Sequence, residues 1–242
     1  MELDASLRYN RTGIFPVRSF FIGGVFVKKT KTQRLILTAM MLAVATAIAL
    51  ICQAIPFINA AFGGGFTVGS MLPIVVIAYM FGTKWGLFCG LAYSVLQMLM
   101  GYSTVSAFFM PSSDSYMVFG HAILVILIDY IIAYTLLGTG GIFRNRMKKI
   151  PALCLGCVVA LSLRYLAHVI SGAIFFGTWA EWFFSEMGAF GESILGTFSG
   201  ASLSVVYSIC YNGMYMIPEI IVTTVLAAVI GNLPQIAPCR VE

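Results

Sequence analysis

Residues 35–55 read LILTAMMLAVATAIALICQAI, an apolar run of 21 residues that contains no charged side chain. A helix of about 20 such residues is long enough to cross the hydrocarbon core of a bilayer. The whole chain has the same character, because 60% of its 242 residues are hydrophobic and only 10% are charged. Soluble domains carry about 25% charged residues. The composition therefore excludes a soluble enzyme, a disordered chain and a conventional nucleic-acid-binding protein, and it predicts an all-α integral membrane protein.

Long apolar runs predict six transmembrane helices, at residues 35–55, 68–82, 85–101, 118–138, 151–177 and 203–231. Their connections differ in charge. Basic residues gather before residue 35, at Lys84 and within residues 139–150. The alternate connections contain no Lys or Arg, and their only charges are Asp114, Glu181, Glu186 and Glu192. Because basic connections stay in the cytoplasm, we expect a multi-pass protein of the cell membrane with both termini cytoplasmic.

One membrane domain, residues 33–235, is expected between two tails. Residues 1–32 form a basic arm that we expect to be flexible, although a start codon placed too far upstream would give the same pattern. Residues 236–242 form a C-terminal tail. Cys154 and Cys157 make a CxxC pattern inside a predicted span, without a second pair or other ligands nearby. We interpret them as small apolar helix residues.

Ionisable side chains inside predicted spans are informative, because each is costly in lipid unless it is paired or lines a cavity. Asp129, Arg164, His168 and Glu219 are such residues. Arg164 and His168 are four residues apart and share a helix face, with Tyr165 one step round the helix. Two interpretations remain open. The first is a buried Asp129–Arg164 ion pair that holds two helices together, and the second is a polar pocket for a small ligand.

Aromatic residues follow His168 into the outer connection, at Phe175, Phe176, Trp179, Trp182, Phe183 and Phe184. They form either an interfacial belt or stacking surfaces for a ligand. Three glutamates in the same connection favour a flat, cationic solute, which aromatic faces and carboxylates both attract. The last span adds Tyr207 and Asn212. The Asn amide offers a donor and an acceptor to a heterocycle, or else it packs helices beside Gly213.

Small residues in the first span, Ala39, Ala43 and Ala47, repeat at four-residue intervals and form a flat strip. The strip either packs inside the protein or docks a partner subunit, and the pattern does not distinguish the two. The sequence has no ATP-binding GxxxxGK[ST], no HExxH and no GxSxG pattern. We therefore expect a protein that is not an enzyme, has no catalytic or metal-binding residues and uses no cofactor.

Four segments, in order along the chain, resemble the thiamine-specific S component of energy-coupling factor (ECF) transporters. They are GGFTVGSMLPI (64–74), LIDY (127–130), LRYLAH (163–168) with Ser171-Gly172, and YSICYNG (207–213). The pair Ala39 and Ala43 matches the AxxxA strip in the first helix of that family. The likeness extends over residues 33–235, and that family has six helices with both ends inside.

The resemblance implies a subunit that captures thiamine, or a close pyrimidine analogue or precursor, from outside and delivers it inward. Such a subunit has no motor of its own. The Ala39 and Ala43 strip would dock on a transmembrane coupling subunit, which two ATP-binding-cassette ATPases drive. A stand-alone secondary transporter or channel for a small organic solute is the alternative.

The resemblance also implies roles for single residues. Asp129 falls at an acidic position that faces the aminopyrimidine, and Asn212 would complete that recognition. Arg164 falls at a basic position, and we assign it as the partner of Asp129. The remaining pocket residues implied are Tyr165, His168, Tyr207, and the stacking groups Phe176 and Trp182. The lid implied over the site is Gly63, Gly64 and Gly65. Tryptophans can stand at the positions of Gly64 and Phe176 in that family, so two stacking groups differ here.

Overall fold

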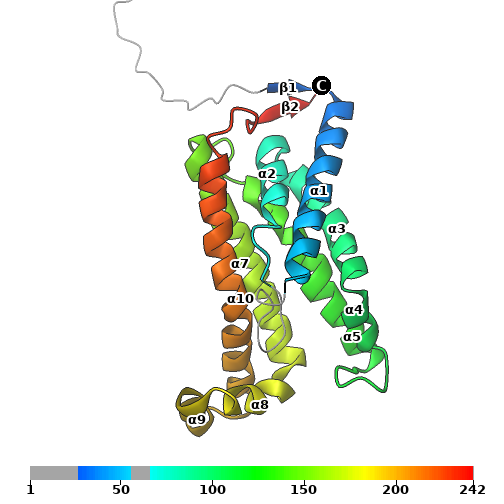
Figure 1. The fold of residues 1–242 in the computed structure, drawn as a ribbon, viewed down its shortest axis with the longest axis vertical. Coiled ribbons are helices and arrows are strands. Elements are labelled where there is room, and N and C mark those ends of the chain that lie inside the picture. Colours follow the sequence, from blue (N-terminus) through cyan, green and yellow to red (C-terminus); the bar gives the residue numbers. More distant parts are fainter. Residues whose placement is uncertain (1–26, 56–65, 242) are drawn as a thin grey trace, which may run out of the picture.

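The computed structural model describes residues 27–55 and 66–241, which form an elongated helical bundle (Figure 1). Its elements are β1 (Val27–Lys29), α1 (Lys31–Gln53), α2 (Leu72–Phe81), α3 (Thr83–Met100), α4 (Tyr102–Ala107), α5 (Phe119–Val125), η2 (Ile126–Ile132), α6 (Ala133–Thr135), η3 (Leu136–Gly141), α7 (Lys149–Phe175), η4 (Gly177–Trp179), α8 (Ala180–Ser185), α9 (Gly188–Thr197), α10 (Gly200–Ile230) and β2 (Cys239–Val241). The long helices run along the bundle. In Figure 1, α8 and α9 lie across its lower end, and β1 and β2 lie at its upper end.

Within the described residues, four helical segments are long and apolar enough to cross a membrane: α1, the composite segment Phe119–Gly141, α7 and α10. They match four of the six predicted spans to within a few residues, so the prediction of a helical membrane protein is confirmed. The other two predicted spans correspond to α2 and α3. Helix α2 has only 10 residues. At 1.5 Å per residue it is about 15 Å long, about half the thickness of the hydrocarbon core.

Helix α2 forms the centre of the bundle. Nine of its ten residues, Leu72 to Met80, are buried, and it packs against α1, α3, η3 and α7. A helix that is apolar on all sides needs such surroundings. Pro73 stands in its first turn, where the missing N–H leaves no hydrogen bond unmade. The helix ends at Gly82, whose φ of 97° favours glycine.

The predicted span 118–138 forms a helix that changes type along its length. Residues Ile126–Ile132 are π-helical, and Leu136–Gly141 form a 3₁₀ helix. A π-helical turn is rare and commonly occurs at functional sites, because it changes the direction in which side chains point. Asp129 lies in the middle of this π-helical stretch. The π-helical stretch around Asp129 is therefore a candidate location for a functional site.

The two ends of the described chain are held together. Strands β1 and β2 pair in parallel, with Val27 opposite Cys239. Arg144 donates from Nη2 to the carbonyl oxygen of Cys239 at 3.0 Å. The predicted flexible arm 1–32 therefore differs from the structure at residues 27–32, which form β1 and the start of α1. The predicted tail likewise contains a strand, and residues 1–26 lie outside the described residues.

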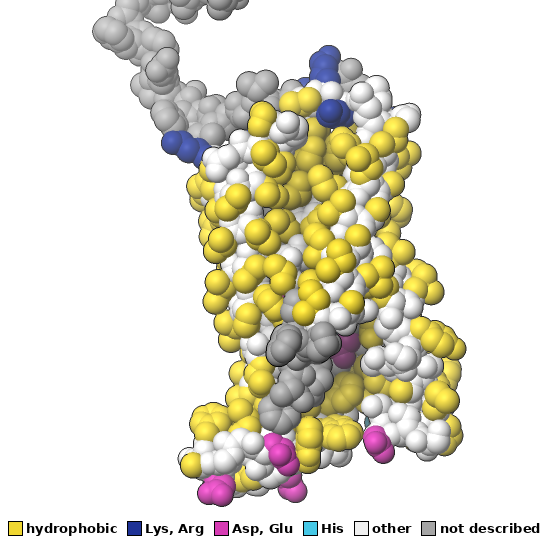
Figure 2. All heavy atoms as spheres, in the orientation of Figure 1, with side chains coloured by type: hydrophobic (Ala, Val, Ile, Leu, Met, Phe, Trp, Pro, Cys, Tyr) yellow, Lys and Arg dark blue, Asp and Glu magenta, His cyan; other side chains and the backbone are white. Residues whose placement is uncertain are grey.

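Most charged side chains lie at the two ends of the bundle. Figure 2 shows Lys and Arg at the upper end, most of the visible Asp and Glu at the lower end, and a wide band of hydrophobic side chains between them. The predicted outer connection 178–202 lies at the acidic end and contains the short helices α8 and α9. A hydrophobic band between two charged ends is typical of a membrane protein.

Glycine contacts bring the backbones of α3, η3 and α7 close together. A Cβ at Gly138 would collide with the backbone of Gly86 and Leu87, and a Cβ at Gly156 would collide with the backbone of Gly140. Small residues allow membrane helices to approach in this way.

We expect Gly138→Ala to lower the free energy of unfolding by about 1–3 kcal/mol, because the added methyl group overpacks a rigid backbone contact. Thermal unfolding in detergent measures the loss. The control is Gly196→Ala in α9, where a Cβ would meet no heavy atom within 4 Å. Equal melting temperatures for the two variants would contradict the close contact.

Candidate functional site

A cavity of about 640 Å³ extends from the middle of the bundle to η4 and α8. Sites for small molecules have volumes of about 300–1,000 Å³. The walls come from the end of α1, residues 66–71, α3, η2, α6, α7 and α10. Seven of the predicted site residues line the cavity: Asp129, Arg164, His168, Phe176, Trp182, Tyr207 and Asn212. The topology thus brings together side chains that lie up to 83 positions apart, from 129 to 212, in the sequence.

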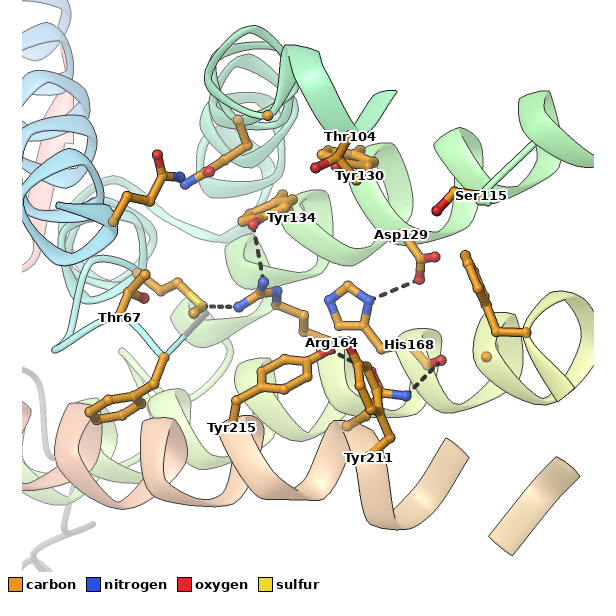
Figure 3. Close-up of a pocket in the computed structure, with 18 of the residues that line it drawn as sticks. Thr67, Thr104, Ser115, Asp129, Tyr130, Tyr134, Arg164, His168, Tyr211 and Tyr215 are labelled. Carbon is orange, nitrogen blue, oxygen red and sulfur yellow. Dashed lines mark hydrogen bonds and ion pairs between the residues drawn. The ribbon is translucent and has the colours of Figure 1, made fainter. Parts of the chain in front are cut away.

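Asp129 is paired with His168 across the helices η2 and α7. Its Oδ1 lies 2.8 Å from His168 Nδ1 (Figure 3), and its Oδ2 accepts a hydrogen bond from Ser171 Oγ at 2.7 Å. The Nε2 atom of His168 is buried and has no hydrogen-bond partner among the described residues. A carboxylate has about four acceptor positions. Asp129 therefore keeps capacity for a ligand, and His168 keeps one ring nitrogen that is buried and unpaired among the described residues.

Arg164 lies one helical turn before His168 on α7 and is 6% exposed. Its Nη1 donates to Met71 Sδ at 2.7 Å, and its Nη2 donates to Tyr134 Oη at 3.0 Å. The guanidinium also lies over the Tyr134 ring, 4.4 Å from its centre. The predicted ion pair with Asp129 is therefore wrong, since Asp129 bonds His168 and Ser171 instead. The bundle holds a polar cavity at this place rather than an Asp–Arg bridge.

Tyr165 lies outside the cavity, so the prediction that it lines the pocket is wrong. Its hydroxyl donates to the carbonyl oxygen of Ile209 in α10 at 2.8 Å. The ring packs near Gly213, where a Cβ would stand 3.3 Å from the hydroxyl. Neighbouring residues on a helix point about 100° apart, so a pocket position at Arg164 directs Tyr165 toward the adjacent helix.

The Asn212 amide is engaged within the protein. Its Nδ2 donates to the carbonyl oxygen of Ser208 at 2.9 Å and contacts Ser208 Oγ and the carbonyl oxygen of His168. Its Oδ1 accepts a hydrogen bond from Tyr215. Asn212 therefore joins α7 to α10, and because the side chain also borders the cavity, its predicted role in reading a heterocycle stays a prediction.

Aromatic rings form the wall nearest α8. Phe176 meets Phe108 edge-on, with ring centres 6.3 Å apart, and Tyr207 packs against Phe183 at 5.3 Å. Trp179 and Trp182 both line the cavity, so either indole is placed to meet a ligand. These rings provide faces for stacking and for cation–π attraction.

Further lining residues were not expected from the sequence. They are Cys52, Thr67, Met71, Gln97, Tyr130 and Tyr134. In an α-helix Tyr130 and Tyr134 would share a face, whereas Asp129 would point about 100° away from Tyr130. The π-helical turn changes this spacing, so the α-helical pattern did not indicate that all three line one cavity. Met71 and Gln97 carried no signal, because apolar or amide residues are common where helices pack.

The remaining predicted residues fall into two groups. The predicted lid residues Gly63, Gly64 and Gly65 lie outside the described residues. Ala39 and Ala43 are exposed on α1, whereas Ala45 and Ala49 face the core. The interpretation that the Ala39 and Ala43 strip packs inside the protein is therefore wrong.

A helical membrane protein with a polar, aromatic-lined cavity at mid-depth belongs to the class of membrane proteins that bind small solutes. The family model described as thiamine transporter protein (Thia_YuaJ) matches residues 38–186. This span is more than half of the chain, and the chain belongs to that family. The resemblance based on four sequence segments is thereby confirmed.

Individual relatives agree with this assignment. The chain is 27% identical over 197 residues to the thiamine transporter ThiT of Bacillus subtilis (strain 168), a match that covers 76% of this chain and 85% of that protein. A solved structure of ThiT from Listeria monocytogenes has the same fold, with a TM-score of 0.58, 21% identity, and coverage of 84% of this chain and 94% of that one. These relatives are transporters, as expected for a chain without enzyme motifs.

We expect Asn212→Ala to lower the stability of the protein by about 1–3 kcal/mol, because Tyr215 and Ser208 lose buried partners. Thermal unfolding in detergent measures the effect. The matched control is Asn232→Ala, which removes an exposed amide just after the end of the same helix. An unchanged melting temperature for Asn212→Ala would show that the amide does not hold α7 to α10.

Proposed function

We propose that this chain is the substrate-binding S component of an ECF transporter, and that it binds thiamine or a close pyrimidine analogue or precursor. The observation that carries the proposal is the Asp129–His168 pair. Asp129 is bonded to His168 and not to Arg164, and both members of the pair line an aromatic-lined cavity. Membership of the thiamine transporter protein family supports the same ligand.

Thiamine joins an aminopyrimidine ring to a positively charged thiazolium ring, and the cavity offers a complement to each. The free acceptor positions of Asp129 suit the amino group of the pyrimidine, and His168 lines the cavity beside this carboxylate. Phe176, Trp179 and Trp182 offer π-faces to the thiazolium cation. Recognition of the heterocycle edge then falls to Asp129 and His168, with Asn212 supporting their helices.

The arrangement of charge supports a topology with both termini in the cytoplasm. The basic residues lie at the end that carries β1, β2 and the 142–148 connection, and basic ends stay inside. Six passages of a domain at residues 33–235 fit this orientation, with α2 forming the inner half of the second passage. The cavity then opens toward the outer, acidic side, from which a cationic vitamin arrives.

Binding can be measured by the quenching of tryptophan fluorescence. Trp179 and Trp182 line the cavity, whereas Trp85 donates to Thr38 at the other end of the bundle. We expect thiamine to quench the fluorescence of the purified protein in detergent. A screen of thiamine, its phosphates and hydroxymethylpyrimidine then identifies the preferred ligand.

We expect Asp129→Ala to weaken thiamine binding by about 1–3 kcal/mol, because the pyrimidine amino group loses its acceptor. The control is Glu192→Ala, which removes an exposed carboxylate of the outer connection. Equal affinities for wild type and Asp129→Ala would contradict the site, and the absence of quenching by thiamine or any pyrimidine would contradict the ligand.

The exposed strip of Ala39 and Ala43 supports docking on a transmembrane coupling subunit driven by two ATP-binding-cassette ATPases. We expect Ala43→Trp to leave thiamine binding by the isolated chain unchanged and to reduce uptake in cells that express the full complex, because the large side chain separates the helices. Val44→Trp, at the neighbouring exposed position, is the control. Thiamine uptake by proteoliposomes that contain this chain alone would contradict the dependence on a partner.

A further inference from the structure

The chain segment before α2 crosses the interior of the bundle without forming a helix. Residues 66–71 have no regular helical structure, yet Phe66, Thr67, Ser70 and Met71 line the cavity. Non-helical backbone at membrane depth is tolerated only where other groups satisfy its N–H and C=O groups. The position of this part of the cavity wall therefore depends on the groups that form hydrogen bonds with the backbone of residues 66–71.

The partner of this backbone is the Glu219 carboxylate of α10. Its Oε2 accepts hydrogen bonds from Thr67 N at 2.8 Å and Thr67 Oγ1 at 3.1 Å. Its Oε1 accepts from Gly69 N at 3.3 Å and from Thr223 Oγ1 at 3.2 Å. Glu219 is 1% exposed and is not among the residues that line the cavity. It stands directly behind the wall.

The turn around this carboxylate has its own requirements. Gly69 has a φ of 73°, a backbone conformation that favours glycine. A Cβ there would also stand 2.6 Å from Leu226 Cδ1. Ser70 Oγ donates to Thr67 Oγ1 at 2.7 Å, which extends the network to a residue of the cavity wall.

The same segment links Glu219 to the ligand-facing groups. Met71 accepts from Arg164, which lines the cavity and attracts the Glu219 carboxylate electrostatically. A buried carboxylate is costly unless it is compensated, and here backbone N–H groups, hydroxyls and an arginine compensate it. Displacing the carboxylate would thus move both the 66–71 wall and the partner of Arg164.

We infer that Glu219 is a positioning residue, which holds the Thr67–Ser70 turn in place so that residues 66–71 form one wall of the binding cavity. The consequence for the affinity of thiamine rests on the proposed function. The consequence for the shape of the wall does not, because the wall can be probed without a ligand.

Cys52 reports on this wall. Its thiol lines the cavity, is 5% exposed, and accepts a contact from Val68 N at 3.4 Å. A displaced Thr67–Ser70 turn uncovers Cys52 to a reagent that enters the cavity. Cys89 and Cys157 are fully buried elsewhere in the core, and they report any general loosening of the fold.

The experiment follows alkylation by N-ethylmaleimide in detergent, with each cysteine resolved by mass spectrometry, and thiamine affinity from fluorescence quenching. The variants are Glu219→Ala, Glu219→Gln and Thr67→Val, with Glu192→Gln as the control for loss of an exposed carboxylate. We expect Cys52 alkylation to be about tenfold faster in Glu219→Ala, because buried N–H groups lose a charged acceptor. Glu219→Gln keeps one acceptor oxygen and should lie between, with thiamine affinity falling in the same order and Cys89 and Cys157 unchanged.

An unchanged rate at Cys52 in the Glu219 variants would overturn the inference. A parallel increase at Cys52, Cys89 and Cys157 would also overturn it, because Glu219 would then act on stability alone. If Glu219→Ala does not fold, Glu219→Gln and Thr67→Val decide the question. Failure of the wild-type protein to bind thiamine would contradict the proposed function only, since a selective change at Cys52 still supports the positioning role.

Discussion

Polar groups inside this apolar bundle must find partners within the protein, and that constraint shapes its centre. Two carboxylates meet it in different ways. Glu219 accepts hydrogen bonds from Thr67 and Gly69 of the segment before α2 and from Thr223 of its own helix. Among the described residues, Asp129 accepts hydrogen bonds from His168 and Ser171 only, and it borders the cavity. The Glu219 carboxylate holds the segment that forms one wall of the cavity, and the Asp129 carboxylate borders the cavity itself.

The cavity exists because the second predicted span is incomplete as a helix. Helix α2 occupies about half the membrane thickness, and its apolar surface is surrounded by α1, α3, η3 and α7. Close glycine contacts such as Gly138 with Gly86 compress that half of the bundle. In the other half, the aromatic rings of Phe108, Phe176, Trp179 and Trp182 line the cavity.

Helix packing engages two polar side chains at or near the cavity. Asn212 and Tyr165 lie on the seam between α7 and α10, where each bonds to the opposite helix. Arg164 lies on the cavity side, but Tyr134 and Met71 hold its guanidinium away from Asp129. The electrostatic field of the cavity thus combines a cation at its inner end with a carboxylate and aromatic faces further out.

Composition and hydropathy determined the membrane class, the approximate positions of the long helices and the separation of charge, because lipid imposes these on any sequence that crosses it. The order of segments such as LIDY and LRYLAH also indicated the family. Only the tertiary structure decided which polar side chains meet. The π-helical turn at Asp129, the half-length α2 and the Glu219 contacts join residues up to 152 positions apart. Such pairings depend on helix rotation and depth, which hydrophobic periodicity does not specify.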